Sequence, residues 1–140
     1  MYRNVADLMT TDVKTLGRND SLSIADEVMR MERIRHLVVL DEYGRLAGIV
    51  SQRDLYFNAL VRALGFGTVA KDRTLQDLPV KSCMVDDPIT VTPETPLSEA
   101  AALLVDHKIG ALPVVEADRL VGILTETDLL RAWTEAPGSS

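Results

Sequence analysis

A seven-residue pattern that occurs twice is the clearest candidate for chemistry in this sequence. Gly, two apolar residues, a hydroxyl residue, two variable residues and Asp run from Gly48 to Asp54 and again from Gly122 to Asp128. The apolar run followed by Ser or Thr predicts a strand that leads directly into a helix. The first amides and the positive dipole end of such a helix favour an anion. An Asp beside them can accept hydrogen bonds from a ribose diol.

The same spacing also has a purely structural interpretation. A Ser or Thr followed three residues later by an acid is close to a capping box, in which the two residues satisfy each other's amide groups at a helix start. Ser51 with Asp54 and Thr125 with Asp128 both have this spacing. The two roles are compatible, and the motif by itself leaves both open.

Each motif lies near the end of one copy of an internal repeat. At an offset of 75 residues, which places Met9 on Met84, residues 9 to 42 contain nine identities, where composition alone gives about two or three. After a one-residue deletion at a turn the offset is 74, and Asp54 meets Asp128. A turn is where a duplicated chain tolerates such a gap.

Each copy is predicted to fold as strand, helix, strand, strand, helix. Short first strands are expected near 14–16 and 89–92, and Asp20 and Thr95 are the expected N-caps of the helices that follow. Apolar runs at 37–40 and 46–50, and at 112–115 and 120–124, predict one hairpin in each copy. A single copy is too small to bury both faces of its sheet. The prediction is therefore an α+β fold in which two βαββα copies pack as a pseudo-twofold pair.

The predicted boundaries are residues 5–65 for the first copy and 80–133 for the second. Residues 66–79 form the expected linker, with a short helix at 74–78, and residues 134–140 the expected disordered tail. These boundaries assign nearly the whole chain to the repeat, and we therefore expect no separate catalytic domain within these 140 residues.

The composition of the chain disfavours nucleic-acid-binding, disulfide-bonded and membrane-spanning proteins. The chain has 140 residues, of which 46% are hydrophobic and 26% charged, and its net charge of −6 disfavours general nucleic-acid binding. The single cysteine, Cys83, excludes an internal disulfide and favours a reducing compartment. No apolar stretch approaches the roughly 20 residues of a membrane span, and no signal-peptide pattern is present. We expect a cytoplasmic protein without a membrane segment.

The two copies resemble a pair of CBS domains, the cystathionine-β-synthase motif. The segments 110–115 and 121–125 are especially similar to the family, and the resemblance covers roughly residues 5–131. It implies a stand-alone Bateman module that binds an adenine nucleotide (AMP, ADP or ATP) or a related adenosyl ligand. It also implies regulation of a partner enzyme or transporter. No required cofactor, metal or catalytic residue is expected.

The resemblance further implies two clefts, each shared by both copies. The main cleft would use Ser51, Arg53, Asp54, Arg35, His36, Asp87, Ile89, Ile109, Gly110 and Ala111. The second would use Thr125, Thr127, Asp128, Asp12, Lys14 and Ile34. We expect tighter phosphate binding in the first, because Arg groups form charge-assisted hydrogen bonds.

Two alternatives stay open at this stage. One is a structural or oligomerisation module without a small-molecule ligand, and the other is a small nucleotide-processing enzyme. We predict a homodimer, because a single small module cannot bury all of the apolar side chains that follow Asp54. These are Tyr56, Phe57, Leu60, Val61 and Leu64, and Trp133 is expected to mark a subunit contact as well. His107 is interpreted as a basic residue at a helix end, and Cys83 as a small core or linker residue.

Overall fold

The structure is a computed structural model that describes residues 2–64 and 78–135. The predicted linker helix at 74–78 therefore lies outside the described residues except for Leu78, and so does the tail beyond residue 135. The elements are α1 (Val5–Leu8), β1 (Thr15–Gly17), α2 (Leu22–Glu32), β2 (His36–Leu40), β3 (Leu46–Ser51), α3 (Gln52–Ala63), the 3₁₀ turn η1 (Val80–Ser82), β4 (Val85–Asp86), α5 (Leu97–His107), β5 (Ala111–Glu116), β6 (Arg119–Thr125) and α6 (Glu126–Glu135).

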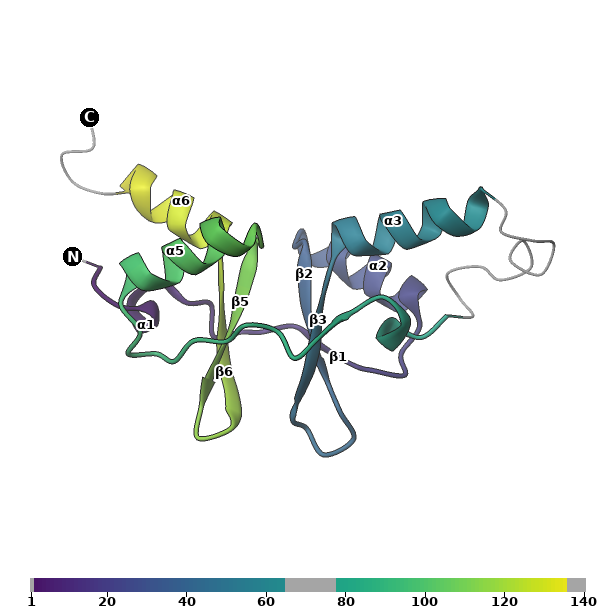
Figure 1. Cartoon of the computed structure of the whole chain (residues 1–140), viewed down its shortest axis with the longest axis horizontal. Coiled ribbons are helices and arrows are strands. Elements are labelled where there is room, and N and C mark those ends of the chain that lie inside the picture. The colour runs from purple at the N-terminus through teal and green to yellow at the C-terminus, as the bar shows by residue number, and fades with distance from the viewer. Residues whose placement is uncertain (1, 65–77, 136–140) are drawn as a thin grey trace. The chain divides into compact units, whose positions relative to one another are not determined.

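The chain forms two compact units that do not coincide with the two sequence copies. Unit 2 is the continuous segment 14–87, whereas unit 1 combines residues 1–13 with residues 88–140. Both units contain a hairpin accompanied by helices (Figure 1). The α+β class predicted from the sequence is confirmed.

Unit 2 has a four-stranded sheet in the order β1-β2-β3-β4. β1 is parallel to β2, β2 is antiparallel to β3, and β3 is antiparallel to β4. Helices α2 and α3 lie beside this sheet (Figure 1). Its core consists of buried apolar side chains from these elements and from residues 78–80, namely Leu16, Leu22, Ala25, Met29, Leu37, Val39, Val50, Leu55, Leu78 and Val80.

Unit 1 is built on the β5–β6 hairpin. The strand predicted at 89–92 is reduced to one parallel bridge between Val91 and Val114. The physical reason is that this part of β5 contains Pro113, which has no N–H to donate to a neighbouring strand. The core contains Val5, Val91, Ala100, Leu104, Leu112, Val114 and Leu124.

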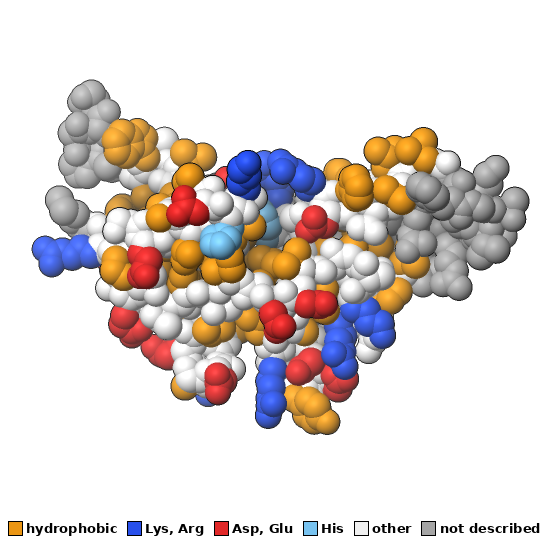
Figure 2. All heavy atoms as spheres, viewed as in Figure 1, with side chains coloured by type: hydrophobic (Ala, Val, Ile, Leu, Met, Phe, Trp, Pro, Cys, Tyr) orange, Lys and Arg blue, Asp and Glu red, His pale blue; other side chains and the backbone are white. Residues whose placement is uncertain are grey.

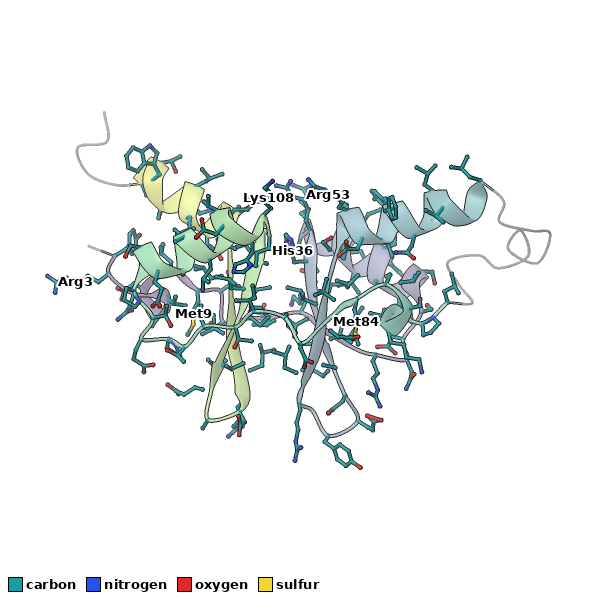
Figure 3. The ribbon with its side chains drawn as sticks, in the orientation of Figure 1. Arg3, Met9, His36, Arg53, Met84 and Lys108 are labelled. Atoms are coloured by element: carbon teal, nitrogen blue, oxygen red, sulfur yellow. The ribbon has the colours of Figure 1, made fainter. Side chains whose placement is uncertain are left out.

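A short extended segment pairs with the hairpin of each unit. Residues 84–86 contact the hairpin of unit 2, and residues 9–10 contact the hairpin of unit 1. Val85 pairs with Ile49 of β3, and Thr10 pairs in the same antiparallel way with Ile123 of β6. Met84 and Met9, labelled in Figure 3, pack partly buried against the two cores. The backbones approach closely because each hairpin has a glycine at the contact point.

The two glycines are equivalent positions of the repeat. A Cβ atom on Gly48 would lie 2.7 Å from the Val85 carbonyl oxygen and 2.8 Å from the Met84 Sδ atom. A Cβ atom on Gly122 would lie 2.8 Å from Met9 Sδ and 3.0 Å from the Thr10 carbonyl oxygen. Gly48 and Gly122 therefore allow the segments at Met84–Val85 and Met9–Thr10 to pack closely on the two hairpins.

Both predicted N-caps are wrong by one residue. Ser21 caps α2 by accepting a hydrogen bond from the Ile24 amide, and α5 has Pro96 at the N-cap position without a side-chain cap. The predicted caps bind elsewhere. The Asp20 carboxylate accepts from the Gly17 amide at 2.8 Å, and the Thr95 hydroxyl accepts from the Thr92 amide at 3.0 Å. In both cases the side chain closes the preceding turn, so it is engaged before the helix begins.

Candidate functional site

The motif of unit 2 joins the end of β3 to the start of α3. The Ser51 hydroxyl accepts from the Asp54 amide at 3.0 Å, and Asp54 Oδ2 accepts from the Ser51 amide at 3.3 Å. The Gln52 amide donates to the Arg35 carbonyl at 2.8 Å, which places Arg35 beside the helix start. The capping-box interpretation is thus confirmed for this motif.

The motif of unit 1 has the same local arrangement. The Thr125 hydroxyl accepts from the Asp128 amide at 3.1 Å, and Asp128 Oδ2 accepts from the Thr125 amide at 3.0 Å. The Glu126 amide donates to the Gly110 carbonyl at 3.0 Å. One contact has no counterpart in unit 2, because the Thr10 hydroxyl lies 3.3 Å from Asp128 Oδ1.

One amide at the start of α3 remains available for a ligand. The amides of Gln52 and Asp54 are used by the contacts just described. Within the described part of the chain, no hydrogen bond from the Arg53 amide is found. A helix N-terminus with an available amide favours an anion.

Two arginine residues belong to the segments that meet at this helix start. Arg35 and Arg53 are both exposed, and neither guanidinium forms an ion pair with any residue that the structure describes. Figure 3 labels Arg53 at the start of α3. Lys14, by contrast, has its Nζ atom 3.9 Å from Glu32 Oε1. Unit 2 therefore offers two guanidinium groups for phosphate oxygens.

The residues predicted for each cleft are divided between the units. Of the main-cleft set, unit 2 contains Ser51, Arg53, Asp54, Arg35, His36 and Asp87, and unit 1 contains Ile89, Ile109, Gly110 and Ala111. Of the second set, unit 1 contains Thr125, Thr127, Asp128 and Asp12, and unit 2 contains Lys14 and Ile34. The clefts shared by the two copies stay predictions.

Within unit 2, His36 is paired across the hairpin with Ser51, and Asp87 is exposed with a φ of 46°.

The apolar residues predicted to contact the ligand also pack against the cores of the two units. Ile34 packs against the core of unit 2, and Ile89 and Ile109 pack against the core of unit 1, all three partly buried. Their remaining exposed surface is what a ligand could contact.

Sequence reasoning did not identify Thr10 as a partner of Asp128. The signal was present in the repeat alignment, where Thr10 meets Val85 and only one copy has a hydroxyl. The separation of 118 residues between Thr10 and Asp128 gave no local indication of the contact.

Three carboxyl groups with a lowered pKa lie outside both motifs. Backbone amides of Arg3 and Asn4 lower the pKa of Asp7, and those of Arg45 and Tyr43 lower the pKa of Asp41. The pKa of Glu42 is lowered by its own backbone amide and by the Arg18 side chain. The shifts of Asp7 and Asp41 arise from a helix cap and a turn, and that of Glu42 arises partly from its ion pair with Arg18.

Large apolar side chains are exposed on α2 and α5 (Ile24, Met31 and Val105) and also on the two helices for which the sequence predicted exposed apolar residues. On α3 these are Tyr56, Phe57 and Leu60, with Val61 half-buried and Leu64 exposed just after the helix ends, and on α6 they are Leu130 and Trp133. Figure 2 shows hydrophobic side chains at the surface over both helices. His107 lies in the last turn of α5, and Cys83 packs against the core of unit 2, as predicted.

Among residues 2–64 and 78–135, no group of three or more His, Cys, Asp and Glu side chains could hold a metal ion. Helices in the same part of the chain are all too short or too polar to span a membrane.

Comparison with known proteins decides the family. The model of the CBS domain matches the chain twice, at residues 5–59 and 80–135. The chain belongs to the CBS-domain family. A CBS domain-containing protein of Dictyostelium discoideum is 32% identical over 127 residues, which are 90% of this chain and 88% of the relative.

Other relatives carry the same region within longer enzymes. Homoserine O-acetyltransferase of Methanococcoides burtonii is 34% identical over 131 residues, or 93% of this chain. The chain spans only 24% of that relative, and 13% of the A-adding tRNA nucleotidyltransferase of Geobacter sulfurreducens.

Solved structures of CBS pairs share the fold. CBSX2 in complex with AMP has a TM-score of 0.77 and 30% identity, covering 96% of this chain and 98% of its own. The CBS domain pair of protein MJ0100, in complex with 5'-methylthioadenosine and S-adenosyl-L-methionine, has a TM-score of 0.79 and 26% identity. It covers 94% of this chain and 96% of its own.

Proposed function

We propose that this CBS pair is a ligand-sensing module that binds an adenine nucleotide of the AMP, ADP or ATP class. The observation that carries the proposal is the start of α3, where Asp54 and the unpartnered Arg53 amide lie together. Asp54 would accept hydrogen bonds from the ribose diol, and the Arg53 amide would donate to a phosphate oxygen. The adenosyl ligands of CBSX2 and of the MJ0100 pair support this ligand class.

The phosphates are expected at the motif of unit 2. Arg35 and Arg53 are near α3, whereas the equivalent positions of unit 1 are Gly110 and Thr127, which carry no charge. Charge-assisted hydrogen bonds are about twice as strong as neutral ones. The main-cleft residues of unit 1, Ile109 and Ala111 among them, stay a prediction from the family resemblance.

Isothermal calorimetry with AMP, ATP and adenosine tests this assignment. Asp54→Asn removes a charged acceptor for the diol and is expected to weaken AMP binding by about 1–3 kcal/mol, since polar ligand groups lose their partner. Asp128→Asn is the matched variant in unit 1 and is expected to have the smaller effect. If Asp128→Asn abolishes tight binding while Asp54→Asn leaves it intact, the site is assigned to the wrong motif.

The phosphate contact is tested separately. Arg53→Ala is expected to weaken ATP binding more than adenosine binding, because adenosine has no phosphate. Arg45→Ala is the control, since it removes the same charge from an exposed residue of the β2–β3 turn. If Arg53→Ala and Arg45→Ala weaken ATP binding equally, Arg53 contributes only through the net charge of the protein and does not contact the phosphates.

We further propose that the module acts without catalysis, by changing the state of a separate enzyme or transporter. The region's occurrence within longer enzymes supports a regulatory role. The catalytic alternative predicts product formation from labelled ATP, and the ligand-free alternative predicts no rise in Tm with any adenosyl compound. A ligand that binds the folded state must raise Tm.

Exposed apolar side chains of α3, and that of Leu64 just beyond its end, support a homodimer. Tyr56, Phe57, Leu60 and Leu64 are 50%, 64%, 56% and 73% exposed, and a second copy could cover them in an isologous contact. Sedimentation at micromolar concentration is expected to give twice the 15.4 kDa of one chain, and Leu60→Lys to shift it toward monomer. Tyr43→Lys, in the β2–β3 turn, is the control. A 15.4 kDa species for the unmodified chain would refute the dimer.

A further inference from the structure

The acids of the two motifs differ in their hydrogen-bond partners. Asp128 is buried, with 8% of its surface exposed. Its Oδ1 atom accepts from the Thr10 hydroxyl at 3.3 Å, and its Oδ2 atom accepts from the Thr125 amide at 3.0 Å. Both carboxylate oxygens of Asp128 therefore have a donor supplied by the chain itself.

Asp54 has only one of these two donors. Its Oδ2 atom accepts from the Ser51 amide, and no donor among residues 2–64 and 78–135 reaches Oδ1. The position equivalent to Thr10 is Val85, whose side chain has no hydroxyl. Asp54 is also less buried than Asp128. One oxygen of Asp54 is thus available to an outside donor.

The equivalence of Thr10 and Val85 is set by the backbone. Thr10 pairs with Ile123 through two hydrogen bonds of 2.9 Å, and Val85 pairs in the same antiparallel way with Ile49. Ile123 and Ile49 are themselves equivalent in the repeat. Because the main chain positions both side chains, exchanging Thr and Val changes the donor and keeps the backbone path.

We propose that Thr10 determines which motif accepts a ribose diol. Its hydroxyl holds Asp128 as a structural group and leaves the diol of a ribonucleoside ligand to Asp54. This inference rests on the proposed function. A diol at Asp128 must displace the Thr10 hydroxyl or share its oxygen, whereas a diol at Asp54 meets an unengaged oxygen. The expected difference is the value of one net hydrogen bond, about threefold to tenfold in affinity.

The reciprocal variants Thr10→Val and Val85→Thr test the proposal by calorimetry with AMP. In an Asp54→Asn background, Thr10→Val is expected to tighten binding about threefold to tenfold, because Asp128 gains an available oxygen. In an Asp128→Asn background, Val85→Thr is expected to weaken binding by a similar factor. Thr11→Val is the control, since it makes the same chemical change at an exposed neighbouring residue.

The diol is checked with a second probe. 2'-Deoxy-AMP lacks one of the two hydroxyl groups, so its affinity is expected to change less than that of AMP in both exchanges. If Thr10→Val leaves AMP affinity unchanged or weakens it in the Asp54→Asn background, the proposal is wrong.

A ligand-free measurement separates this proposal from the proposed function. A double-mutant cycle of Thr10→Val and Asp128→Asn, followed by urea unfolding, measures the contact itself, and additive effects would overturn the proposal. If the unmodified chain binds neither AMP nor ATP nor S-adenosylmethionine, the proposed function fails and the selectivity role fails with it. If the chain binds AMP and only the exchanges have no effect, the selectivity role alone fails.

Discussion

Replacing Gly122 by Ala tests how the N-terminal segment is held in unit 1. The added Cβ atom would lie 2.8 Å from Met9 Sδ and 3.0 Å from the Thr10 carbonyl oxygen. The Met9 side chain can rotate away, but the Thr10 carbonyl is backbone and is bonded to the Ile123 amide at 2.9 Å. Relief of the clash therefore lengthens that hydrogen bond. It also displaces the N-terminal segment, whose Val5 side chain is buried in the core of unit 1.

The magnitude follows from two opposing effects. Overpacking of a well-packed contact costs about 1–3 kcal/mol, and the loss of glycine's freedom in the unfolded chain returns about 0.4–1 kcal/mol. The net loss expected for Gly122→Ala is about 1–2 kcal/mol, which lowers Tm by about 3–8 °C. Gly48→Ala is expected to cost at least as much, because its Cβ atom would lie 2.7 Å from a backbone oxygen.

Urea unfolding followed by circular dichroism measures this loss, and hydrogen exchange locates it. Exchange of the Thr10 and Ile123 amides is expected to accelerate most. Gly17→Ala is the control, because the nearest atom to its added Cβ is 3.6 Å away and its stability should change by no more than about 0.5 kcal/mol. Equal unfolding midpoints for Gly122→Ala and Gly17→Ala would refute the reasoning.

Three further predictions concern stability. The pKa of Asp41 is lowered from its ordinary value of 3.8, so the stability that its ionised carboxylate contributes is present above that pH and is lost as pH falls through the lower folded-state pKa. In urea titrations between pH 5 and 3, the Asp41→Asn variant should therefore lose less stability than the unmodified chain. Parallel plots of stability against pH for the two proteins would contradict this. Ala117 has a φ of 50° in the two-residue β5–β6 turn, where Asn is favoured, so Ala117→Asn should raise stability by about 0.5–1 kcal/mol; a fall in Tm would disprove it. Ser51→Ala removes the cap of α3 and should cost about 0.5–2 kcal/mol by urea unfolding, and an unchanged midpoint would argue against the capping role.

The local parts of the site could be predicted from the sequence. The spacing of Ser51 and Asp54, and of Thr125 and Asp128, predicted the reciprocal hydrogen bonds that the structure contains. Both hairpins follow the predicted apolar runs within about one residue. These features depend on contacts over three residues or across a short turn, so the information lies in adjacent sequence.

Cap positions were less predictable. Asp20 and Thr95 are good cap residues, but the turn before each helix binds their side chains first. Ser21 then caps α2 in place of Asp20. Residues with cap propensity compete for the same few amides, and the winner depends on the path of the backbone.

The sequence by itself determined the repeat, the two motifs, both hairpins and the long helices that flank them, because each follows from local spacing or from self-similarity; it did not predict α1 or β4. The tertiary structure decided which segment completes which hairpin, and hence that Thr10 lies on Asp128 while Val85 takes the equivalent place in unit 2. The physical reason is that two similar hairpins offer similar edges to two similar segments. The choice between them depends on how the backbone connects and packs over a separation of more than one hundred residues, for which no short stretch of sequence carries a signal.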